Sequence, residues 1–141
     1  MTTPIRAASL TLLLMLPLLA AAQVAVIVNP KSALTSLTAD QAAAIFMGRT
    51  NVLPSGAAAQ AADLPEASTS REQFYSKAAG KSSAQVKAAW SRLTFSGKAT
   101  PPKELTSAAD VKKHVAANPD AIGYIEKSAV DATVKVVLVL D

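Results

Sequence analysis

The sequence contains no cysteine and a single histidine among its 141 residues. Without cysteine, thiol catalysis, thiolate metal ligation and disulfide bonds are excluded, so the fold depends on its hydrophobic core. With His114 alone, a multi-histidine metal site is excluded, and a Ser-His-Asp triad would need that one residue as its base. The sequence therefore gives no indication of a metal ion or a cofactor.

The chain also lacks a large excess of positive or negative charge. The chain has 14 Lys+Arg against 10 Asp+Glu, a formal net charge of +4, and only one tryptophan and two tyrosines. Because the lysines are scattered and aromatic residues are few, this pattern does not indicate a nucleic acid partner. A mild positive charge would still help to attract a small anion.

The longest apolar run lies near the N-terminus. Arg6 precedes a leucine-rich run from Leu10 to Leu19, and Ala20-Ala21-Ala22 follows. This order is typical of a secretory signal peptide, predicted over residues 1–22, with residues 23–141 as one domain. Removal of Arg6 leaves 13 Lys+Arg against 10 Asp+Glu. The alternative is an uncleaved membrane anchor, for which the run is short, since a spanning helix needs about 20 residues.

Short apolar runs alternate with helical patterns along the rest of the chain. Strands are predicted over 24–28 (VAVIV), 57–64, 121–125 (AIGYI) and 134–140 (VKVVLVL). Helices are predicted from Thr38 to Gly48, over 71–80, over 82–95 and from Ser107 to Asn118. This alternation predicts an α/β sandwich around a small sheet, with 24–28 and 134–140 as interior strands and the two chain ends close together.

Two residues that often mark binding sites have ordinary structural interpretations here. Trp90 shares a helical stripe with Val86 and Leu93, which favours a core anchor over a ligand-stacking role. His114 lies beside two lysines, and we expect it to face solvent without a role in a site.

The stretch "EASTSREQF" (66–74) permits two interpretations. Thr69 with Glu72, and Ser70 with Gln73, both have the spacing of a capping box, which would explain the hydroxyl groups as helix caps. A helix start also offers free N–H groups and a positive dipole end to an anion, and Arg71 would add a bidentate guanidinium. The spacing alone leaves both possibilities open.

Four segments together resemble a known family. They are "IFMGRTNVLPSG", "STSREQFYSKAAG", "AWSRLTFSGKATPP" and "VAANPDAIGYI". This order resembles the periplasmic phosphate-binding family (PBP-like, type II periplasmic binding proteins), which serves ABC importers. The resemblance covers nearly all of residues 23–141. It implies a small three-layer α/β sandwich corresponding to one lobe of the usual two-lobed protein, and a periplasmic location.

The resemblance also implies a ligand site. Ser68-Thr69-Ser70 stands where the family has a Ser-Gly-Thr turn that donates to phosphate, so Thr69 replaces a glycine. In the family an arginine precedes this turn, and the corresponding position here lies near Leu64, with Asp63 and Glu66 close by. Arg71, which follows the turn, would take the role of that arginine.

The segment "NPKSALTSLT" resembles the family's early loop before the first helix. Its hydroxyl residues are either further donors or ordinary loop residues. The candidate ligand-binding residues are therefore Ser32, Thr35, Ser36, Ser68, Thr69, Ser70 and Arg71.

Three functions are compatible with these observations. The first is a secreted, non-enzymatic protein that binds phosphate or a similar oxyanion. The second is an interaction module that has lost its ligand and docks onto an envelope protein or onto a second copy. An enzyme is the weakest of the three, because Asp63 and Glu66 could form a carboxylate pair but nothing else organises a reaction around them.

Overall fold

The computed structural model describes residue 4 and residues 22–141. Apart from residues 4 and 22, the predicted signal peptide lies outside these described residues. The elements are β1 (Val24–Val28), α1 (Ala39–Phe46), β2 (Gln60–Asp63), α2 (Thr69–Ala79), α3 (Ser83–Phe95), β3 (Lys103–Glu104), α4 (Ala108–Ala117), β4 (Ala121–Glu126), the 3-10 turn η1 (Lys127–Ala129) and β5 (Lys135–Leu140). No helix within the described part of the chain is long and apolar enough to span a membrane.

The helices begin where side chains satisfy their first free N–H groups. Thr38 caps α1 in a capping box with Gln41, and Ser107 caps α4, so both predicted caps are confirmed. The helix start in "EASTSREQF" is capped by Ser68, whose hydroxyl accepts from the N–H of Arg71. The predicted capping boxes of Thr69 and Ser70 are wrong, because all three neighbouring hydroxyls can act as caps and the structure uses the first.

Five strands form one sheet in the order β3-β2-β4-β1-β5. β4 runs antiparallel to β1 and parallel to β2, and β5 runs antiparallel to β1, which places Leu140 opposite Val24. The predicted closeness of these two segments is confirmed. The prediction of β5 as an interior strand is wrong, because β5 is an edge strand. The predicted strand over 57–64 is shorter in the structure, and the two-residue strand β3 is not among the strands predicted from the sequence.

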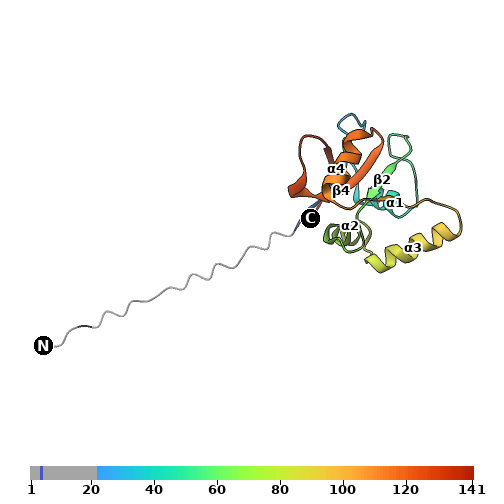
Figure 1. Cartoon of the computed structure of the whole chain (residues 1–141), viewed down its shortest axis with the longest axis horizontal. Coiled ribbons are helices and arrows are strands. Elements are labelled where there is room, and N and C mark those ends of the chain that lie inside the picture. The colour runs from blue at the N-terminus through green and yellow to red at the C-terminus, as the bar shows by residue number, and fades with distance from the viewer. Residues whose placement is uncertain (1–3, 5–21) are drawn as a thin grey trace.

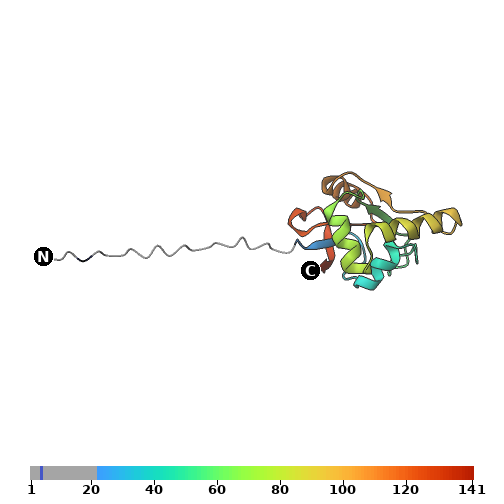
Figure 2. The same ribbon diagram turned by 90° about the horizontal axis from the view of Figure 1, so that it is seen from below.

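The predicted three-layer sandwich is confirmed. Side chains of β4 alternate between the two faces of the sheet, and Figure 2 shows helices on both sides. On one face, Tyr124 stacks on Phe74 of α2 with 4.2 Å between ring centroids and 4° between ring planes, and α1 packs beside α2. On the other face, Gly123 lies under α4, and a Cβ built there would be 2.6 Å from Cγ1 of Val111.

Helix α3 extends outward from the edge of the molecule (Figure 1). Only Val86 of this helix is buried, and Phe95 at its end is 96% exposed. Trp90 anchors the helix: its indole N–H donates to the carbonyl oxygen of Phe46 over 2.8 Å, and its ring packs on the core. The predicted anchoring role of Trp90 is therefore confirmed.

Candidate anion sites

Of the predicted ligand residues, Ser68 caps α2, and Thr69, Ser70 and Arg71 form its first turn. The hydroxyl of Ser68 is occupied by the N–H of Arg71 at 3.3 Å. The N–H groups of Thr69 and Ser70 lie in the first turn, where no acceptor within the helix is available. Thr69 is exposed, whereas Ser70 is buried. The turn thus presents backbone donors and the positive end of the helix dipole next to the end of β2.

Arg71 turns back toward β2 and away from solvent. Its Nη1 donates to the carbonyl oxygen of Leu64 at 3.0 Å and lies 3.7 Å from Oδ2 of Asp63. The guanidinium carbon lies 5.3 Å from the ring centroid of Tyr75, and the side chain is only 13% exposed. Within the described residues, Nε of Arg71 is buried without a hydrogen-bond partner. The fork predicted for an external anion is therefore paired with an internal carboxylate.

Asp63 is surrounded by donors although it is only 5% exposed. Its carboxylate accepts from the hydroxyls of Tyr75 and Tyr124, and from the N–H of Leu64 at 2.8 Å. Burial, and after it the negative charge of Asp63, raises the pKa of both tyrosines, so both hydroxyls stay protonated and donate. The protein's own carboxylate thus occupies donors of the kind that an oxyanion requires.

The other predicted residues, Ser32, Thr35 and Ser36, do not join this turn. They follow the C-terminal end of β1, which the pairing register places at the same end of the sheet as the first residues of β2, with β4 between the two strands. Their loop then runs along the edge strand, where the N–H of Leu37 donates to the carbonyl oxygen of Val137 at 2.9 Å. The start of α2 follows the opposite end of β2, and β2 is separated from β5 by two strands.

A separate pocket of about 480 Å³ is lined by basic side chains that the sequence analysis did not link to one another. We call it the cationic pocket. Its lining residues are Ile45, Gly48, Arg49, Thr50, Asn51, Ala59, Gln60, Ala61, Trp90, Lys98, Ala99, Thr100, Pro101, Pro102, Lys103 and His114. Four of these carry a basic group and, in this lining drawn from the described residues, none carries a carboxylate.

Sequence reasoning missed this pocket because its basic residues come from three separate segments. The expectation that His114 faces solvent without a site role is only partly met, since the residue is half-buried. Its Nε2 lies 3.4 Å from the carbonyl oxygen of Gln60, at the pocket wall. The one available signal was the position of Arg49 and Lys98, each directly after a glycine in a family-like segment.

Metal chemistry has no support in the part of the chain that the structure describes. No group of three or more His, Asp or Glu side chains there is arranged to hold a metal ion. The expectation that no metal is bound remains a prediction.

Comparison with known proteins identifies the fold. No family model matches the chain, and no curated protein matches it by sequence. Among solved structures, an ABC-type phosphate transport receptor from Vibrio cholerae superposes with a TM-score of 0.64 at 22% identity, covering 82% of this chain and 46% of its own.

Two further solved structures give the same result. One is a phosphate ABC transporter substrate-binding protein from Clostridium perfringens, solved with bound phosphate. It superposes with a TM-score of 0.65 at 22% identity, covering 82% of this chain and 45% of its own. PstS from Borrelia burgdorferi superposes with a TM-score of 0.60 at 18% identity, covering 82% of this chain and 47% of its own. The chain thus has the fold of one lobe of a type II periplasmic binding protein, and it spans about half the length of these structures.

Proposed function

We propose that this chain is a secreted, non-enzymatic protein that binds a small oxyanion of the phosphate type outside the cytoplasm. The observation that carries the proposal is the shared fold, over 82% of the chain, with proteins of phosphate transport, one of which was solved with bound phosphate. Export rests on the predicted signal peptide over residues 1–22. The same neighbours support a role with an ABC importer as part of this proposal.

The start of α2 is the proposed binding site. Its donors are the N–H groups of Thr69 and Ser70, the hydroxyls of this turn and the guanidinium of Arg71. A helix start of this kind stabilises an anion through its N–H groups and its dipole. Ser32, Thr35 and Ser36 lie near β5 and contribute no contact to this site.

Binding at this site requires an exchange of partners at Arg71. The guanidinium leaves Asp63 and turns toward the oxyanion, and the carboxylate keeps its tyrosine and backbone donors. The unpaired Nε of Arg71 lowers the cost of this movement, because a buried donor without an acceptor is itself unfavourable. Competition from Asp63 makes the affinity low.

The melting temperature of the purified protein tests the proposal. We expect phosphate at millimolar concentration to raise the melting temperature of the wild type, because a ligand at 100 times its Kd stabilises by about 2.7 kcal/mol. Sodium chloride at matched ionic strength is expected to give no comparable rise. Arg71→Ala is expected to lose the phosphate effect, whereas the control Arg92→Ala, an exposed arginine of α3, keeps it.

An equal phosphate shift in wild type and Arg71→Ala would exclude Arg71 as a ligand. No shift with phosphate, sulfate or other oxyanions would favour the second candidate function, an interaction module. Its specific support is α3, which extends outward and exposes 96% of Phe95.

A further inference from the structure

The cationic pocket is distinct from the start of α2. Neither Asp63 nor any residue from Ser68 to Arg71 lines it. Trp90, Pro101 and Pro102 form the wall that it shares with the neighbouring hollow of Asp63 and Arg71. Its basic residues are Arg49 after α1, Lys98 and Lys103 in the segment that leads into β3, and His114 on α4. Three segments thus bring positive charge to one hollow, which favours an anionic ligand.

The pocket is too large for an inorganic oxyanion alone. A volume of about 480 Å³ lies within the range of small-molecule sites, which is roughly 300–1,000 Å³. Apolar side chains form part of its wall, among them Ile45, the Trp90 ring and the pair Pro101-Pro102. A ligand with an apolar body beside its charged group would fill this space.

The ring of Trp90 is a preformed surface. Its N–H is already bonded to the carbonyl oxygen of Phe46, which fixes the ring orientation. Gly48 permits close packing against the ring, because a Cβ at that position would lie 2.8 Å from Cη2 of Trp90. A ring held in this way loses little freedom when a ligand stacks on it.

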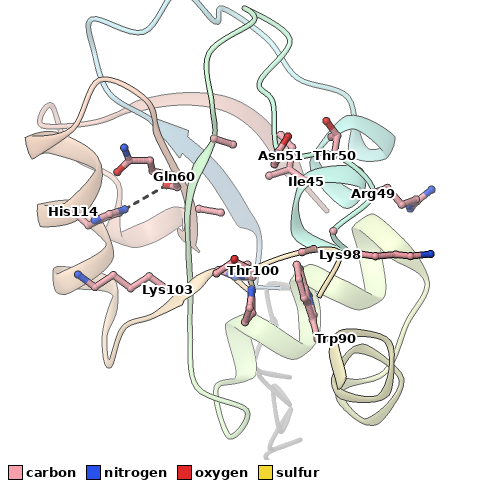
Figure 3. Close-up of a pocket in the computed structure, with 16 residues that line it drawn as sticks. Ile45, Arg49, Thr50, Asn51, Gln60, Trp90, Lys98, Thr100, Lys103 and His114 are labelled. Carbon is pink, nitrogen blue, oxygen red and sulfur yellow. Dashed lines mark hydrogen bonds between the residues drawn. The ribbon is translucent and has the colours of Figure 1, made fainter. Parts of the chain in front are cut away.

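The charged groups are separated along the pocket. In the view of Figure 3, Arg49 and Lys98 extend outward at one end of the pocket, Lys103 and His114 lie at the other, and Trp90 and Thr100 lie between the two ends. Arg49, Lys98 and Lys103 are exposed, so their long side chains can turn toward a ligand at small cost. This spacing suits a ligand with a doubly charged group at one end and a polar group at the other.

We propose that the cationic pocket binds an organic phosphate, a small phosphomonoester with a flat or apolar body. The phosphate group, which carries a charge of about −1.5 to −2 at neutral pH, lies between Arg49 and Lys98. The body lies on the Trp90 ring and the proline wall. Lys103, His114 and Gln60 take the polar end.

Tryptophan fluorescence tests this proposal directly, since Trp90 is the only tryptophan. We expect phenyl phosphate to change the emission in a saturable titration, with a Kd at least about tenfold lower than that of inorganic phosphate or of phenol. The doubly substituted Arg49→Gln, Lys98→Gln protein is expected to bind phenyl phosphate at least about tenfold more weakly. Both residues are exposed, so the fold is expected to persist.

Two controls separate binding in this pocket from binding elsewhere on the protein. Lys113→Gln removes a charge next to His114 but outside the pocket lining and is expected to leave the titration unchanged. Arg92→Ala, which changes an exposed arginine of α3 outside the pocket lining, is also expected to bind phenyl phosphate like the wild type. Unchanged affinity in the Arg49→Gln, Lys98→Gln protein, or loss of binding in Arg92→Ala or Lys113→Gln, would overturn the proposal.

Discussion

Replacement of Asp63 by alanine is expected to lower the free energy of unfolding by about 3–5 kcal/mol, the cost typical of removing one partner of a buried charged pair. The change leaves the buried hydroxyls of Tyr75 and Tyr124 without their acceptor, and the N–H of Leu64 keeps only the Tyr124 hydroxyl oxygen, at 3.3 Å. It also leaves the guanidinium of Arg71 without its carboxylate. Urea unfolding measures the effect as a lower midpoint with an unchanged slope.

Glu66 provides a matched control for this prediction. It is an acidic residue three positions later, and its carboxylate lies 3.8 Å from Nζ of Lys87, with side-chain exposures of 57% and 70%. An exposed pair of this kind contributes little, so Glu66→Ala is expected to unfold like the wild type. If Asp63→Ala were as stable as Glu66→Ala, the carboxylate would not organise this part of the core.

Replacement of Gly48 by alanine is expected to cost about 2–5 kcal/mol, from backbone strain and overpacking together. Gly48 has a φ of +75°, which L side chains rarely adopt. A Cβ there would also lie 2.7 Å from Cδ1 of Leu93 and 2.8 Å from Cη2 of Trp90. Both contacts belong to α3, so the change displaces this helix from the C-terminal end of α1. Calorimetric unfolding measures the loss as a lower melting temperature.

A substitution at Gly97 distinguishes the effect of backbone strain from that of overpacking. Its φ of +69° is similar, but no atom lies within 4 Å of a Cβ built there. Gly97→Ala therefore carries the backbone strain without the steric contact, and about 1 kcal/mol is expected. Equal losses in the two variants would show that α3 accommodates a side chain at Gly48 without displacement.

Local signals in the sequence predict most of the fold, and they fail where contacts between distant segments determine the structure. Helix starts at Thr38 and Ser107 follow from a hydroxyl followed by an amide or acid at the third position. The apolar run of β5 suggests an interior strand, yet β5 is at the edge. Its exposed side is covered by the loop after β1, through the hydrogen bond from Leu37 to Val137, and this long-range contact leaves no local pattern.

The candidate sites show the same limit. The sequence correctly placed a capped helix start near Ser68, but it could not show that Arg71 faces Asp63. That pairing depends on Tyr75 and Tyr124, which lie 49 positions apart and reach the same carboxylate only in the folded chain. Likewise, Arg49 and His114 are far apart in the sequence, so no spacing reveals the pocket that they share.

Anion binding at the start of α2, in competition with Asp63, is best tested by calorimetric titration of phosphate into wild type, Asp63→Asn and Arg71→Ala. Asparagine keeps the shape of Asp63 but removes the charge that competes for Arg71. We expect weak binding to the wild type, binding at least about tenfold tighter to Asp63→Asn, and none at the α2 start in Arg71→Ala. Equal phosphate affinity in all three proteins would contradict binding at this helix start.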